Sequence, residues 1–95
     1  MERIPVVFRI RRCNIPRLIK VTGTCQALKG VDRVLITEAL KIIERFEKFD
    51  GIPYQFEDGN PIQASQNEIT VYFYMLFKTE ESVFKAIQSM QEGLG

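Results

Sequence analysis

The sequence predicts an α+β fold, a two-layer sandwich in which a four-stranded, mostly antiparallel sheet has two helices on one face, in the order ββαββα. Apolar and polar side chains alternate around a turn in residues 4–22, and residues 31–49 and 79–95 carry apolar side chains at helical spacing. Residues 67–78 form a long apolar stretch of strand type. Ninety-five residues are enough for one core, so we expect a single domain over residues 1–95.

The first expected element is a β-hairpin over residues 4–22, with its turn in the segment CNIP. Pairing Arg12 with Arg17 keeps the apolar residues of both strands on one face, whereas a one-residue slip would bring Lys20 among them. In this register Arg9 lies opposite Lys20. Like charges that face each other across an antiparallel pair are destabilising, so an anionic group is expected to relieve them.

The main helix is expected over residues 31–49, because apolar residues recur there at helical spacing and Gly51 follows its end. Residues 24–30 are interpreted as a short helical turn ahead of it. Ile36 and Leu40 widen the apolar stripe beyond what one sheet face needs. We therefore expect the second helix or another chain to cover part of this stripe.

A short third strand is expected in the segment IPYQFEDG, with Tyr54 and Phe56 pointing inward and a turn beginning at residues 58–59. Residues 58–67 form a long, amide-rich connection, and long loops in compact domains are often either functional or mobile. The sequence leaves the role of this loop open.

The segment NEITVYFYMLFK at residues 67–78 predicts a fourth strand with two apolar rows. One row is Ile69, Val71, Phe73, Met75 and Phe77, and the other is Thr70, Tyr72, Tyr74 and Leu76. Thr79 is the expected N-cap of the C-terminal helix, whose first turn contains two glutamates. The first row faces the core, so the second row needs a different explanation.

One face of the predicted sheet is left without a cover, because the chain supplies two helices and both are needed on the other face. This face is expected to carry Val7, Arg9, Arg11, Leu18, Lys20, Thr22, Gln55, Glu57, Thr70, Tyr72, Tyr74 and Leu76. The candidate binding residues among them are Arg9, Arg11, Lys20, Tyr72, Tyr74 and Leu76.

Charge is unevenly distributed along the chain, although the net charge is only +1. Residues 1–30 carry seven bases and one acid, while residues 31–95 carry six bases and eleven acids. This asymmetry points to an anionic partner at the N-terminal end, or simply to a protein whose two ends attract each other.

The leading functional hypothesis is a small non-enzymatic interaction protein that binds a partner protein, in the simplest case a second copy, through the open face. Tyrosine suits such a surface because it buries a large ring and keeps a polar tip, and exposed apolar patches mark interaction sites. The sequence names no partner or process, and it does not decide between association through the sheet and through the helices.

The alternative hypothesis is a single-stranded nucleic-acid-binding module, in which tyrosines stack on bases while arginine and lysine contact phosphates. The near-neutral charge is unlike the strongly basic domains that phosphate binding usually needs. A third interpretation needs no ligand, since aromatic residues favour strands and edge arginines discourage aggregation.

No catalytic residues, cofactor or metal are expected. The chain has no histidine, which removes the usual general base, and its glycines lack the spacing of phosphate-binding loops. Cys13 and Cys25 are expected to be unpaired thiols, too far apart along one strand to form a disulfide. No apolar run is long enough to cross a membrane, and no secretory signal is recognisable, so we expect a cytoplasmic protein.

Overall fold

A computed structural model describes residues 6–54 and 62–94 of the chain. Its elements are β1 (Val7–Arg12), β2 (Leu18–Gln26), α1 (Val31–Glu47), β3 (Ile52–Tyr54), β4 (Ile62–Ala64), β5 (Glu68–Leu76) and α2 (Glu80–Leu94). The strands form one antiparallel sheet in the order β1-β2-β5-β3, and β4 also pairs with β5. The predicted α+β class is confirmed, with β4 as an additional strand that makes the order ββαβββα.

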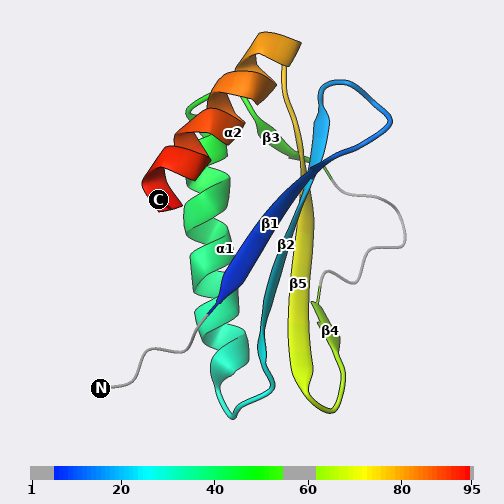
Figure 1. The fold of residues 1–95 in the computed structure, drawn as a ribbon, viewed down its shortest axis with the longest axis vertical. Helices are drawn as coiled ribbons and strands as arrows, with labels where there is room; N and C mark the ends of the chain where they lie inside the picture. The colour runs from blue at the N-terminus through cyan, green and yellow to red at the C-terminus, as the bar shows by residue number, and fades with distance from the viewer. Residues whose placement is uncertain (1–5, 55–61, 95) are drawn as a thin grey trace.

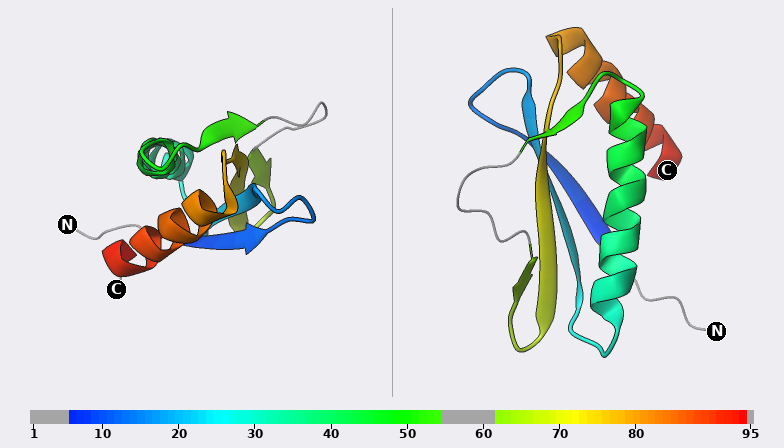
Figure 2. Two further views of the ribbon diagram at one scale, coloured as in Figure 1. Left: turned by 90° about the horizontal axis from the view of Figure 1, so that it is seen from above. Right: turned by 180° about the vertical axis from the view of Figure 1, so that it is seen from behind.

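Both helices pack against the same face of the sheet (Figures 1 and 2). Val83 and Met90 of α2 join Phe46 of α1 in one core cluster with Ile19 and Met75 of the sheet. A second cluster, around Val31, Leu35, Ala39, Cys25 and Val71, is formed by α1 and the sheet without a described residue of α2. The two apolar faces therefore meet as the sequence pattern predicts.

The first hairpin has the predicted faces, but its register differs by two residues. Arg12 pairs with Ile19 instead of Arg17, and Phe8 pairs with Gly23. The ring of Phe8 occupies the space that a Cβ on Gly23 would fill. A two-residue shift leaves every side chain on the same face, so the hydrophobic pattern could not reveal it; the close approach of a ring to a glycine favours the observed pairing.

The inward orientation predicted for Tyr54 was wrong. Tyr54 pairs with Tyr74 in the β3–β5 ladder, and directly opposite residues of an antiparallel pair share a face. Tyr54 therefore lies on the face away from the helices. The core at this end is already filled by the rings of Phe46 and Phe77, which meet edge to face with centroids 5.9 Å apart.

The segment before α1 also differs from expectation. Residues 24–26 continue β2 as strand, and the proposed helical turn over 24–30 is reduced to a turn at residues 29–30. Gly30 has φ 81°, a left-handed conformation that suits glycine, and it stands immediately before the helix. The expectations for Gln55, Phe56, Glu57 and the turn at 58–59 lie outside the described residues.

Neither of the helices in the described part of the chain combines the length and apolar character that crossing a membrane requires.

Candidate functional site

The face of the sheet away from the helices carries the candidate site, and we call it the open face. Within the described residues it consists of Val7, Arg9, Arg11, Leu18, Lys20, Thr22, Thr24, Gln26, Ile52, Tyr54, Gln63, Glu68, Thr70, Tyr72, Tyr74 and Leu76. All six candidate binding residues are among them. Tyr54 and Ile52 were missed, because only the pairing of β3 with β5 reveals which face they occupy.

Strand pairing arranges the open face in rows that run across the strands. One row is Arg11, Lys20, Tyr74 and Tyr54, in which each residue is paired directly with the next. Opposite side chains in such rows lie close enough to interact. This row is a band across the sheet, with two cations in β1 and β2 followed by two tyrosines in β5 and β3.

The neighbouring rows grade from apolar to polar along the strands. Leu18, Leu76 and Ile52 form an aliphatic row on one side of the band, and Arg9, Thr22 and Tyr72 form a mixed row on the other. The next row is Val7, Thr24, Thr70 and Gln63. The apolar and aromatic part of the open face is consequently concentrated near the end of the sheet where β3 lies.

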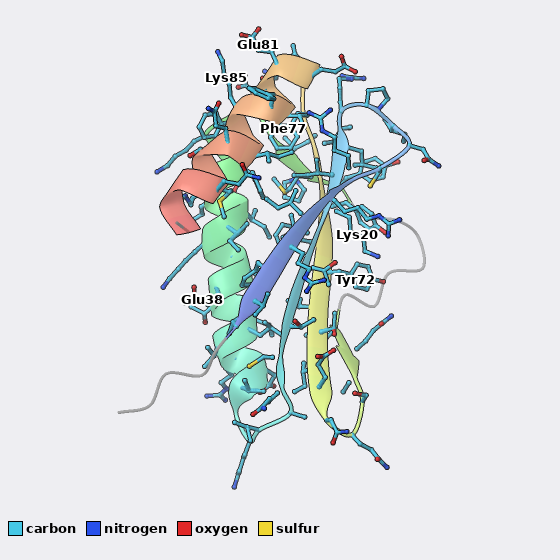
Figure 3. All side chains as sticks on the ribbon, viewed as in Figure 1. Lys20, Glu38, Tyr72, Phe77, Glu81 and Lys85 are labelled. Atoms are coloured by element: carbon cyan, nitrogen blue, oxygen red, sulfur yellow. The ribbon has the colours of Figure 1, made fainter. Side chains whose placement is uncertain are left out.

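Lys20 is held between two tyrosine rings. Its Nζ lies 4.8 Å from the ring centroid of Tyr72 and 5.7 Å from that of Tyr74. The two rings are themselves edge to face, with centroids 6.1 Å apart and an interplanar angle of 86°. Figure 3 shows Lys20 and Tyr72 together on the side of the sheet opposite the helices. The faces of the tyrosine rings carry negative electrostatic potential, so they attract the Lys20 ammonium group in the absence of a carboxylate partner among the described residues.

The observed register of the first hairpin places a different cation opposite Lys20 from the one that was predicted. Arg11, and not Arg9 as expected, lies directly opposite Lys20, while Arg9 faces Thr22. Within the described residues, neither these arginines nor Lys20 forms an ion pair. The ion pairs that the described residues do form, Lys41–Glu38 and Lys85–Glu81, lie on the helices. The positive charge of the open face is thus uncompensated by described carboxylates.

The side chains of the open face differ in how far they are exposed to solvent. Leu18 is only 2% exposed, which the sequence did not predict for this face, and it belongs to neither core cluster. Tyr72, Tyr74, Leu76 and Lys20 are half-buried. Arg9, Arg11, Val7 and Ile52 are exposed. The surface presented to solvent is therefore a half-buried aromatic centre with exposed basic and aliphatic residues at its margins.

Another base of the N-terminal segment has a structural contact. Arg17 donates through Nη1 to the carbonyl oxygens of Phe77 and Lys78, at 3.4 and 3.3 Å, and its own carbonyl accepts a bond from the Phe77 amide. These contacts join the start of β2 to the segment between β5 and α2. Arg17 is exposed like Arg9 and Arg11, but its guanidinium already has these backbone partners.

The remaining expectations concern thiols, metals and the helix stripe. Cys13 and Cys25 are free cysteines, as predicted, and Cys25 is buried. Within the described residues there is no cluster of three or more histidine, cysteine, aspartate or glutamate side chains that could hold a metal ion. Ile36 and Leu40 of α1 remain exposed, so no described residue of α2 covers them.

The geometry defines the protein as an antiparallel α+β sandwich in which both described helices pack on one face of the sheet and neither covers the open face. Comparison with protein-family models, with curated proteins and with solved structures found no match to the chain.

Proposed function

We propose that this protein is a non-enzymatic binding domain that contacts a partner protein through the open face, in the simplest case a second copy of itself. The observation that carries the proposal is the packing of Lys20 against Tyr72 and Tyr74, which fixes an aromatic centre on a sheet face that no helix covers. Aromatic residues at the centre and charged residues at the margin are typical of protein interfaces.

The orientation of the rings favours protein over nucleic acid. Tyr72 and Tyr74 stand nearly perpendicular to each other, and Lys20 lies against both rings. Successive bases of a single strand stack best on aromatic faces that are free and similarly oriented. A protein surface has no such requirement, because it can bury ring edges and hydroxyl groups as readily as ring faces.

The partner is expected to present acidic side chains to Arg9, Arg11 and Lys20. A second copy could supply them, since residues 31–95 carry eleven acids against six bases. Several of these acids lie on the helices, as Glu38 and Glu81 do in Figure 3. Complementary charge would then steer association and set its orientation.

Light scattering across a concentration series tests the proposal. Tyr74→Asp should shift the assembly toward the monomer while circular dichroism shows an intact fold, because a carboxylate would be buried without its hydration. Phe84→Asp is the matched control, since Phe84 is an aromatic residue of α2 that is 61% exposed and lies outside the open face. The proposal would be overturned if the wild type were monomeric and also failed to bind proteins with acidic surfaces. It would also be overturned if Phe84→Asp lowered the mass and Tyr74→Asp did not.

A nucleic-acid function is the second candidate, because Arg9, Arg11 and Lys20 form no ion pair with a described carboxylate. The probe is a labelled oligothymidylate, titrated at several salt concentrations. Arg9→Ala and Arg11→Ala should each weaken binding and lower the salt slope by roughly 1 per lost phosphate contact. Arg33→Ala, an exposed arginine of α1, is the control. Salt-insensitive binding or none would remove this candidate.

A further inference from the structure

Strand β1 is an edge of the sheet, and its outer side has a groove beside it. The sheet order ends at β1, and among the described residues the backbone of Val7–Arg12 bonds to no element other than β2. An unpaired strand edge is a template on which another extended chain can add. Six residues are about the length of an ordinary strand, so the edge is long enough for such pairing.

The groove lies between β1 and α2 and has a volume of about 400 Å³. Its lining residues are Phe8, Ile10 and Arg12 of β1 and Ile87, Met90 and Gln91 of α2. Four of these six residues are apolar, and Arg12 and Gln91 add a guanidinium and an amide to the lining. The groove borders the helix side of β1, whereas Arg9 and Arg11 lie on the open-face side.

We infer that an extended, acidic segment of another protein adds to β1 as a further strand of the sheet. Alternate residues of such a segment point to opposite sides. Apolar side chains at every second position would enter the groove against Ile10 and Ile87, and acidic side chains between them would lie beside Arg9 and Arg11. Backbone hydrogen bonds supply affinity in this binding mode, and the alternating pockets supply specificity.

Charge selects the occupant of the edge. Arg9, Arg11 and Arg12 are exposed and form no ion pair within the described residues. Two copies of β1 could pair antiparallel with their faces aligned, but the two longest registers of that kind place Arg9 opposite Arg9 or Arg11 of the other copy. Like charges directly opposite are destabilising. The arginines thus disfavour a second copy and favour an acidic strand at this edge.

The test uses a labelled, end-blocked peptide of alternating valine and glutamate, flanked by prolines that limit its own strand pairing. Binding to the full chain is measured by fluorescence anisotropy and mapped by amide chemical shifts. The expected shifts lie in Val7–Arg12 and around Ile87–Gln91, and not at the opposite edge in β3. Two further peptides are controls, one of scrambled order and one N-methylated at alternate residues.

Charge reversal distinguishes this specific strand pairing from nonspecific peptide binding. Arg9→Glu combined with Arg11→Glu should weaken the valine–glutamate peptide by ~10-fold or more, and a valine–lysine peptide should regain binding to that variant. Arg33→Glu on α1 is the matched control. Tyr74→Asp should leave peptide binding unchanged, so failure of the open-face proposal would not affect this one.

The inference is overturned by any of four results. The first is that the N-methylated or the scrambled peptide binds as tightly as the valine–glutamate peptide, and the second is that the chemical-shift changes are confined to the β3 edge. The third is that no binding is detected at roughly millimolar peptide. The fourth is that the wild type is a dimer and Ile87→Glu lowers its mass, because a second copy would then be the occupant.

Discussion

The ammonium group of Lys20 lies over the ring of Tyr72, 4.8 Å from its centroid, while Arg11 stands directly opposite Lys20 on β1. One cation is thus stabilised by an aromatic ring beside it and destabilised by a cation across from it. The aromatic contact is worth about 0.5–1 kcal/mol at an accessible site. The repulsion acts in the opposite direction and weakens with added salt.

The first prediction is that Lys20 and Tyr72 are energetically coupled. A double-mutant cycle with Lys20→Met and Tyr72→Leu should give a favourable coupling of about 0.5–1 kcal/mol in the free energy of unfolding. Urea denaturation of the four proteins measures it. A coupling indistinguishable from zero would mean that Lys20 does not contact the ring in solution. Arg11→Met alone should stabilise the protein at low salt.

The second prediction concerns Gly23, which lies beneath the ring of Phe8. A Cβ at this position would overlap the ring. Gly23→Ala should therefore lower the free energy of unfolding by about 1–3 kcal/mol, the usual cost of overpacking. Thr22→Ala, one residue earlier on the open face, is the control. Phe8→Leu in the Gly23→Ala background should recover part of the loss, and no recovery would show that the overlap is not the cause.

The sequence predicts faces much better than it predicts partners. Alternation placed Arg9, Arg11, Lys20, Tyr72 and Tyr74 on one face, because the side-chain period of a strand is fixed at two. The same period does not distinguish registers that differ by two residues, so Arg9 instead of Arg11 was predicted to lie opposite Lys20.

The position of β3 could not be derived from local pattern at all. Tyr54 faces outward because β3 pairs with β5 and because Phe46 and Phe77 already fill the core nearby. Both facts depend on contacts between segments far apart in the sequence. The cross-strand row that ends at Tyr54, and the groove between β1 and α2, needed the strand order and were accessible only from the structure.

The third prediction is that the two thiols react at different rates. Cys13 is partly exposed in the first hairpin, whereas Cys25 is only 4% exposed and belongs to the second core cluster. A thiol reagent should modify Cys13 quickly in the native protein and Cys25 only after local or global opening. Mass spectrometry of timed samples measures both. Equal rates without denaturant would contradict the observed burial. In Cys13→Ser the fast phase should disappear, and only the slow modification of Cys25 should remain.

The last prediction separates the sheet from the helices as the surface of self-association. Leu40 is 57% exposed and Ile36 37% exposed on α1, one helical turn apart, so they form an apolar stripe that a second copy could cover. Leu40→Glu should change the free energy of unfolding by less than about 0.5 kcal/mol, because the side chain is already in solvent. If the open face is the interface, Leu40→Glu also leaves the mass in solution unchanged while Tyr74→Asp lowers it. The opposite result, a monomer with Leu40→Glu and an unchanged assembly with Tyr74→Asp, would assign self-association to α1 and leave the aromatic centre around Lys20 for a different partner.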